Sequence, residues 1–149
     1  MSQGAPNADL ADLVRRAGEA AEAIITGDLH RYADLLPHSG DFTLFAPFGG
    51  EPRHGFDDSD EALDATAAFF QGGEAQVEVV QAQASGDLAV LVVVEREHGG
   101  VGGLPDQDLS LRATMIFRRE AGEWKLLHRH ADPLLHPIDL EQFARLAAG

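Results

Sequence analysis

The first part of the chain has the apolar spacing of an amphipathic helix. Leucine, valine, alanine and isoleucine recur at intervals of three and four residues between Leu10 and Ile24, and charged side chains stand between them. This period places the apolar residues on one helical face. Gly27 is suited to end the helix, and Asp28 can cap a second, shorter helix that stops before Pro37. Two helices therefore precede any strand.

A short strand and a third helix follow. Residues 42–46 have the composition of a strand, and the proline and glycine residues of 47–52 supply a turn before a return through Arg53 and His54. Ser59 or Asp60 then begins a helix, which we expect Gly72 and Gly73 to stop.

From residue 76 onward the apolar period changes to two or to continuous runs, which predicts strands. Four segments show this pattern: 77–84, 88–97, 109–119 and 124–131. Their links are short or glycine-rich, so we expect an α+β fold with sequential antiparallel hairpins and no crossover helices.

Residues 88–94 are apolar on both faces of their strand. A helix layer should therefore cover one side of a curved sheet and a partner subunit the other, which predicts a homodimer. At the end of the chain, residues 139–147 have the pattern of a tail helix, with Leu140, Phe143 and Leu146 on one side. We expect this helix to dock on the rest of the domain.

The composition narrows the classes of function. The chain has 149 residues, no cysteine and a formal net charge of −14. Its length suits one domain, which we place at 8–149 after a flexible N-terminus at 1–7. The charge repels phosphate backbones and anionic membranes, so we expect no nucleic-acid partner. No window reaches the roughly 18 apolar residues of a membrane span, and this, with the missing cysteine, favours the cytoplasm.

Candidate chemistry lies in the last strand. Its alternating residues are Trp124, Leu126, His128 and His130 on one face, and Lys125, Leu127 and Arg129 on the other. Charges at Lys125 and Arg129 would be costly to bury unpaired, so the apolar set should face the helices. His128 and His130 would then project inward. Imidazole titrates near neutrality, so either ring could act as an acid or a base, with Asp132 orienting it.

Two other interpretations of this histidine pair stay open. With a third ligand such as Asp132, Asp41 or His54, the pair could bind a metal ion. As a satisfied polar cluster, the two rings would only rim a ligand cavity. Because histidines in such positions more often hydrogen-bond a carbonyl or a carboxylate, we expect neither a metal nor another cofactor.

A wall for an apolar small-molecule ligand can be assembled from several elements. We expect it to include Tyr32, Phe45, Phe48, His54, Arg112, Met115 and Trp124. Aromatic residues at helix or strand spacing are also ordinary core residues. Arg112 could bind a carboxylate or an enolate in the cavity. It could instead pair with an acidic neighbour on the outer face of the sheet, and this second interpretation is favoured.

Two stretches carry a resemblance to known proteins. They are residues 42–55, Phe-Thr-Leu-Phe-Ala-Pro-Phe-Gly-Gly-Glu-Pro-Arg-His-Gly, and residues 122–130, Gly-Glu-Trp-Lys-Leu-Leu-His-Arg-His. With the order of elements, they resemble the nuclear transport factor 2-like superfamily over nearly the whole chain. The first is similar to ketosteroid isomerases. The second is similar to SnoaL-like proteins and to the association domain of the calmodulin-dependent kinase. The resemblance implies a cystatin-like fold, in which a cone-shaped antiparallel sheet wraps around N-terminal helices.

The residues that isomerase catalysis would need are missing. The resemblance places the general-base aspartate at Ala46 and the oxyanion-hole tyrosine near Ala20. It places the partner aspartic acid near Thr114 or Met115. Because proton abstraction next to a carbonyl needs a base within hydrogen-bond reach, the steroid-isomerase mechanism is not supported.

The isomerase-like register also conflicts with burial. It puts the face of Arg112, Thr114 and Ile116 in the pocket, whereas burial favours the face of Ala113 and Met115. A single β-bulge would reconcile the two, because one extra residue reverses the facing of a strand.

Two functions result as predictions. The first is a SnoaL-like pocket protein that binds or turns over a small, largely apolar molecule, with acid–base chemistry from a histidine. The alternative is a non-catalytic ligand-binding or dimerisation module, which the missing isomerase residues favour.

Overall fold

The structure, a computed structural model, describes residues 7–149, so the flexible N-terminus predicted at 1–7 lies outside the described residues except for Asn7. The elements in chain order are α1 (Asn7–Ile25), α2 (Leu29–Leu35), β1 (His38–Phe45), β2 (Arg53–His54), α3 (Asp60–Ala67), β3 (Phe70–Ser85), β4 (Leu88–Val101), β5 (Gln107–Asp108), β6 (Leu111–Glu120), β7 (Glu123–Asp132) and α4 (Leu140–Ala148). Three helices lie among the first elements, and most strands follow, as predicted.

The helix ends follow from the residues that stand there. Gly27 has a φ of 81°, its N–H donates to the carbonyl of Ile24, and the N–H of Asp28 donates to the carbonyl of Ala23. This pair of bonds is the Schellman motif, which confirms the predicted stop of α1. Asp28 then caps α2, and the Ser59 hydroxyl caps α3 by accepting from the N–H of Ala62.

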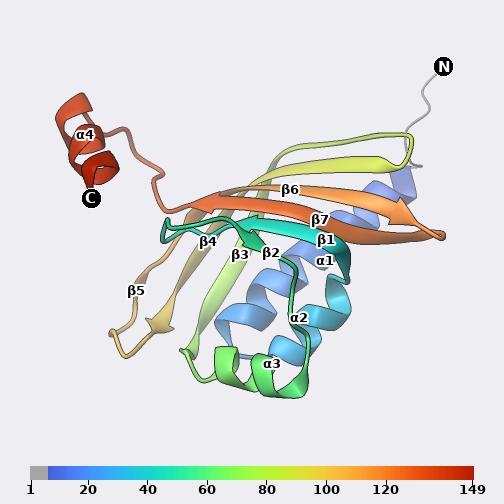
Figure 1. Cartoon of the computed structure of the whole chain (residues 1–149), viewed down its shortest axis with the longest axis horizontal. Coiled ribbons are helices and arrows are strands. Elements are labelled where there is room, and N and C mark those ends of the chain that lie inside the picture. The colour runs from blue at the N-terminus through green and yellow to red at the C-terminus, as the bar shows by residue number, and fades with distance from the viewer. Residues whose placement is uncertain (1–6) are drawn as a thin grey trace.

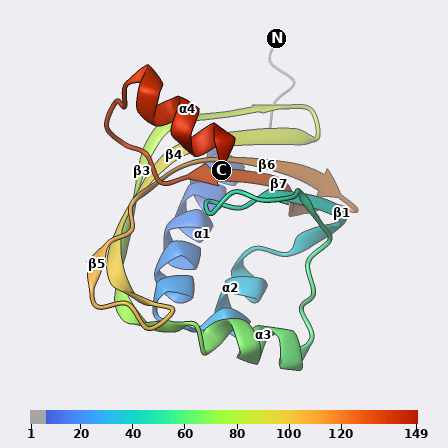
Figure 2. The same ribbon diagram turned by 60° about the vertical axis from the view of Figure 1, so that its left-hand side comes forward.

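The strands form one curved sheet in the order β2-β1-β7-β6-β4-β3, with β5 paired to β4. The sheet curls around α1 and α2, and α3 lies at its lower edge (Figures 1 and 2). This confirms the predicted α+β architecture and the antiparallel hairpins. One pairing differs from the expectation, because β1 lies parallel to β7. The chain enters β1 from α2 and not through a tight turn from β7. No hairpin therefore forces β1 to run antiparallel to β7.

The core lies between α1 and the inner, helix-facing side of the sheet. α1 packs on β3 and β4, and its Leu13 and Ala17 join a cluster with Leu91, Met115 and Phe117. These residues are almost fully buried. The face of β6 that burial favoured is therefore the inner one.

The start of β3 corrects a sequence expectation. Gly72 and Gly73 were expected to stop α3, but α3 ends at Ala67 and both glycines lie inside β3. A Cβ on Gly73 would collide with the carbonyl oxygen of His98 on β4. Glycine here permits close approach of two strands, which is its other common role in a sheet.

The tail helix also differs from the expectation. Helix α4 was predicted to dock, yet none of its residues, 140–148, is buried, and it stands clear of the sheet in Figure 1. Its amphipathic pattern shows that one face should be covered, but a pattern does not say what covers it. Within residues 7–149, no helix is both long and apolar enough to cross a membrane.

Candidate functional site

A β-bulge in β7 decides which side chains reach the inner side of the sheet. Phe117 of β6 pairs with Leu126, but the preceding Ile116 pairs with His128, so Leu127 is an extra residue. One extra residue reverses the facing of everything after it. Trp124 and Leu126 therefore face the core, and beyond the bulge Arg129 takes the inner face, opposite buried Met115.

The bulge places His128 and His130 on the outer face, so the expectation that both rings point inward is wrong. The Thr43 hydroxyl lies 2.7 Å from Nδ1 of His128. The ring of Phe45 meets the His128 and His130 rings edge-on at 5.4 and 5.2 Å. His130 also lines a groove with Val92 and Val94, which point away from the helices.

Asp132 and Arg112 lie on the same outer face. The Arg112 guanidinium is 2.9 Å from the Asp132 carboxylate, and both side chains are substantially exposed. This is the pairing that the sequence favoured for Arg112. It leaves Asp132 turned away from the inner side.

A buried ion pair occupies the inner side in their place. Arg129 donates from both terminal nitrogens to the two carboxylate oxygens of Glu95, at 2.7 and 2.8 Å. The side chains are only 17% and 5% exposed. Burial alone would raise the pKa of Glu95, but the charge and hydrogen bonds of Arg129 outweigh it and hold that pKa below its ordinary value. The pair therefore stays ionised, and both terminal nitrogens of Arg129 are used in bonds to Glu95.

Glu97 stands two residues further along β4, on the same face as Glu95. Burial and then the neighbouring charge of Glu95 raise the pKa of Glu97 to about 8. At neutral pH Glu97 is therefore a neutral carboxylic acid, and Glu95, Glu97 and Arg129 together carry no net charge.

Aromatic rings from α2, β1 and the loop between β2 and α3 form a cluster that reaches this polar group through Tyr32. Tyr32 on α2 lies close enough to feel the charges of Arg129 and Glu95, and burial raises its pKa. The His38 ring stacks on Phe56 with centroids 3.9 Å apart and meets Phe42 edge-on at 4.4 Å. Leu44, beside Arg129 in the register of β1 and β7, adds an apolar side chain.

His38 is held neutral. Its Nδ1 lies 2.6 Å from the carbonyl oxygen of Leu36, to which it can only donate. Burial lowers the pKa of the ring to about 4. Its buried Nε2 finds no hydrogen-bond partner within residues 7–149. This nitrogen is an unused acceptor on the inner side.

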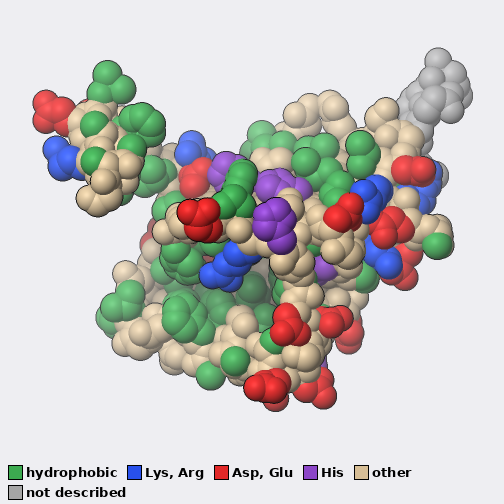
Figure 3. Space-filling view, viewed as in Figure 1, with side chains coloured by type: hydrophobic (Ala, Val, Ile, Leu, Met, Phe, Trp, Pro, Cys, Tyr) green, Lys and Arg blue, Asp and Glu red, His purple; other side chains and the backbone are tan. Residues whose placement is uncertain are grey.

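The surface is hollowed between the strands β1 and β2 and the helix α3, and hydrophobic side chains line the hollow (Figure 3). Partly buried apolar residues of α2, β1, β6 and the loop before α3 pack against the core, among them Tyr32, Leu44, Phe56 and Leu111. Leu111 is the register partner of Glu95. On the inner face of the sheet, apolar side chains thus lie beside the paired charges of Glu95 and Arg129.

The remaining predicted wall residues are dispersed. Phe48 is 82% exposed in the loop after β1, and His54 is exposed on the edge strand β2. Met115 is fully enclosed in the core. Trp124 is buried, where its indole N–H donates to Asp9 of α1 over 3.1 Å. Of the predicted wall residues, Tyr32 is the one beside the Arg129 and Glu95 pair.

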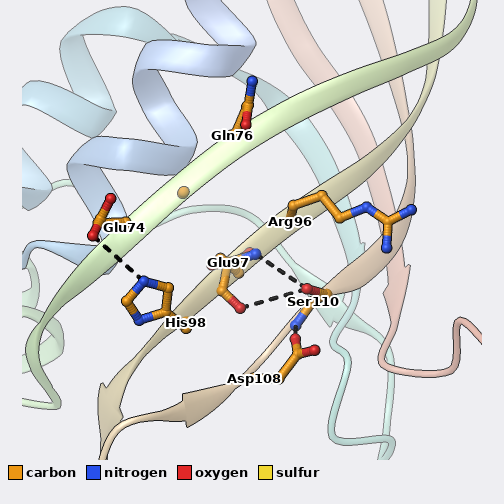
Figure 4. A pocket seen from close by; sticks show the side chains of 8 residues that line it. Glu74, Gln76, Arg96, Glu97, His98, Asp108 and Ser110 are labelled. Atoms are coloured by element: carbon orange, nitrogen blue, oxygen red, sulfur yellow. Dashed lines mark hydrogen bonds and ion pairs between the residues drawn. The ribbon is translucent and has the colours of Figure 1, made fainter.

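A second groove, of about 560 Å³, runs along β3, β4 and β5 on the outer side (Figure 4). Glu97 reaches this groove from β4 and is one of the residues that line it, beside Ser110. The other charged residues of its walls are mostly paired internally. His98 lies 2.9 Å from Asp106 and 3.5 Å from Glu74, and Asp108 accepts from the N–H of Ser110. We assign it no ligand. Among residues 7–149 no three histidine, aspartate or glutamate side chains gather as metal ligands.

The sequence did contain a signal for the residues that were missed. Leu91 and Val93 are core residues of β4, and Glu95 and Glu97 continue their alternation. Period two therefore carries two carboxyl groups to the inner face. A buried carboxylate needs a cation, and Arg129 was available in the neighbouring predicted strand.

Comparison with known proteins agrees with this architecture. A family model described as a SnoaL-like domain matches residues 16–135. No curated protein matches the sequence.

Three solved structures illustrate the likeness. A candidate dehydratase of the NTF2-like family from Streptomyces avermitilis is 21% identical, with 89% of this chain and all of that one covered and a TM-score of 0.70. An NTF2-like protein from Pseudomonas putida KT2440 is 23% identical, with 93% and 94% covered and a TM-score of 0.67. The association domain of CaMKII from C. elegans is 17% identical, with 85% and 96% covered and a TM-score of 0.60. These likenesses concern the fold.

Proposed function

Because the chain belongs to the SnoaL-like domain family, we propose that its inner hollow binds one small, largely apolar and uncharged molecule, and that Glu97 donates a hydrogen bond to an oxygen atom of that molecule. What supports this proposal is the place of Glu97 on β4, two residues from the buried pair of Glu95 and Arg129, where burial and the charge of Glu95 raise the pKa of Glu97 to about 8.

The charge of the ligand follows from how the polar groups are paired. Arg129 spends both terminal nitrogens on Glu95, so an anionic ligand would have to break this pair or remain unpaired in a buried place. A cation would favour ionised Glu97 and would have to offset the burial that keeps it neutral. A neutral molecule with an acceptor oxygen meets neither cost.

The chemistry open to such a site is acid catalysis. Glu97 can pass its proton to a carbonyl or hydroxyl oxygen of the ligand, and the resulting carboxylate would lie near Arg129. A carboxylic acid with a pKa close to the working pH suits this role. His38, with its free Nε2 lone pair, is the imidazole on this side of the sheet, so it replaces His128 and His130 as the candidate histidine.

Matched naphthalene probes test the proposal. 2-Naphthol, 2-naphthoate and 2-naphthylmethylammonium share one ring system and differ in charge, and calorimetry measures their affinities. We expect 2-naphthol to bind about tenfold or more tightly than either ion, and Glu97→Leu to remove that preference. Glu74→Gln, on an exposed glutamate of β3, is the matched control. Equal affinities for the three probes, or tightest binding of the anion, would contradict a neutral-ligand site.

A second role, self-association, is favoured by the outer face. β4 carries Val90, Val92 and Val94 on this face, and on β1, across β6 and β7 from them, Phe45 is 44% exposed. Soluble proteins rarely leave such apolar surface uncovered. We therefore propose a homodimer that pairs through the outer face, and we retain the cytoplasm as its proposed compartment because the chain has no cysteine.

A further inference from the structure

Helix α4 is capped at its start, but none of its residues, 140–148, is buried against the rest of the described chain. Asp139 and Gln142 form a capping box, with the Gln142 N–H donating to Asp139 over 2.8 Å and the Asp139 N–H to Gln142 over 3.1 Å. The apolar side chains Leu140, Phe143 and Leu146 are 83%, 60% and 66% exposed. A helix of nine residues is marginal alone in water. Packing against another surface would supply the missing stability.

The two sides of α4 are cleanly separated. At 100° per residue, Leu140, Phe143 and Leu146 fall on one side, with Glu141 and Arg145 on the opposite side. The helix therefore offers an apolar face with no charge on it. A surface that receives this face must be apolar and slightly concave.

The outer face of the sheet has such a surface. A groove of about 250 Å³ runs across β3, β4, β6 and β7, and its walls include Val80, Val92, Val94, Thr114 and His130. Val80 is the bulged residue of β3 and is 66% exposed. The charges at the rim, Arg112 and Asp132, are 2.9 Å apart and neutralise each other. Covering the groove would therefore bury no unpaired charge.

We propose that two copies of this chain exchange their C-terminal helices, so that α4 of each lies in the outer groove of the other. This inference rests on the proposed homodimer and specifies how it is held together. Both complementary surfaces belong to the same chain, so a twofold pair buries each of them twice and closes on itself. The segment before α4 contains Pro133 and Pro137, which restrict its path, and it leads α4 away from its own sheet in the view of Figure 1.

The absence of natural cysteine permits a direct cross-linking test. Ala147→Cys, on α4, and Thr114→Cys are made in separate chains, mixed, and treated with a short bismaleimide. We expect a product of twice the 15.9 kDa chain mass that contains one chain of each kind. Ala65→Cys, exposed on α3, is mixed with Ala147→Cys as the control and should give no such product. If the double variant cross-links only within one chain, α4 docks on its own sheet and the exchange is refuted.

Light scattering separates failure of the exchange from failure of the dimer. Leu140→Ser with Phe143→Ser, and separately Val80→Lys, change exposed residues, so the fold should persist by circular dichroism. Each should weaken self-association about tenfold or more. A full-length chain that is monomeric overturns both proposals. A dimer that survives these changes and gives no mixed cross-link overturns the exchange alone.

Discussion

Arg129 and Glu95 are joined by two hydrogen bonds, at 2.7 and 2.8 Å, between β7 and β4, which are separated in the sheet by β6. The pair crosses β6 diagonally, because Arg129 is level with Met115 and Glu95 is level with Leu111. It is the feature around which the neutral acid at Glu97 and the ring of Tyr32 are arranged.

Removing one partner of this pair should be costly. Arg129→Met leaves the Glu95 charge buried without a cation, and we expect a loss of about 3–5 kcal/mol in the free energy of unfolding. Replacing both residues, Glu95→Leu with Arg129→Met, should recover most of the loss, because two apolar side chains need no partner. Urea denaturation of the single and double variants measures both effects.

The exposed pair on the other side of the same sheet is the control. Arg112→Met breaks a 2.9 Å contact to Asp132 between substantially exposed side chains, and it should cost no more than about 1 kcal/mol. Similar losses at Arg112 and Arg129 would contradict the burial assigned to Arg129.

Glu97 should make stability fall as the pH rises from about 4.5 to about 8. Its pKa is about 8 in the folded chain and 4.5 as the ordinary value, so between these values the folded state binds more protons than the unfolded state. The contribution is therefore complete below about pH 4.5 and is lost as the pH rises through 8. Melting temperatures at about pH 6 and pH 9, with Glu97→Gln for comparison, measure the effect.

The glutamine variant cannot ionise, so its melting temperature should change less over this interval than that of the natural chain. Glu74→Gln, at an exposed position, should leave the natural pH dependence in place. If Glu97→Gln and the natural chain respond alike, Glu97 is already ionised at neutral pH and the proposed donor is lost.

His38 should lower the stability of the folded chain at acid pH. Its folded pKa of about 4 lies below the ordinary 6.5, so the unfolded state binds more protons between these values and stability falls as the pH drops through them. The loss attributable to this ring is on the order of 1–3 kcal/mol. Comparing His38→Phe with the natural chain at about pH 7 and pH 4 isolates it, because the other acidic groups are common to both.

A proton NMR titration of the ring gives an independent measurement. The His38 signal should titrate near pH 4, and His136→Gln, on an exposed loop histidine, identifies a signal to exclude. A His38 signal that titrates at the ordinary value would show that the ring is open to water.

The bulge at Leu127 can be tested by deletion. Without residue 127, strict alternation from Leu126 would place His128 on the outer face and Arg129 on the inner one, where they already lie. The ion pair of Arg129 with Glu95 would therefore persist, so we expect the deletion variant to fold, with a loss of no more than about 3 kcal/mol in urea denaturation. Deletion of Ile116, in the regular strand β6, would reverse the facing of half of that strand and should cost several kcal/mol or prevent folding. Equal losses in the two deletion variants would show that Leu127 is not an extra residue.

The fold could be predicted from the sequence further than the site could. The spacing in α1, the Schellman glycine at Gly27 and the period of two after residue 76 each depend on local interactions. The facing of β7 does not. Residues of the two predicted faces alternate without interruption from Trp124 to His130. The rule that unpaired charges avoid burial then placed Arg129 on the outer face. That rule has an exception for a charge with a buried partner, and the partner, Glu95, lies 34 residues away in the sequence.

The docking of α4 could not be predicted for a different reason. The helix itself was found, because its capping residue Asp139 and its apolar stripe are local. Whether the stripe meets its own sheet, another molecule or solvent depends on the path of the segment through Pro133 and Pro137. That path is not encoded in the period of the helix.

The extra residue in β7 also bears on how this strand can evolve. Its first half is tied to the closed, apolar end of the sheet through Trp124 and Leu126, and its second half supplies the inner cation and the outer histidines. Substitutions can alter either half alone. Loss of the extra residue would restore strict alternation and leave both surfaces where they are, so among descendants of this chain we anticipate that a one-residue change in the length of β7 is tolerated at the bulge.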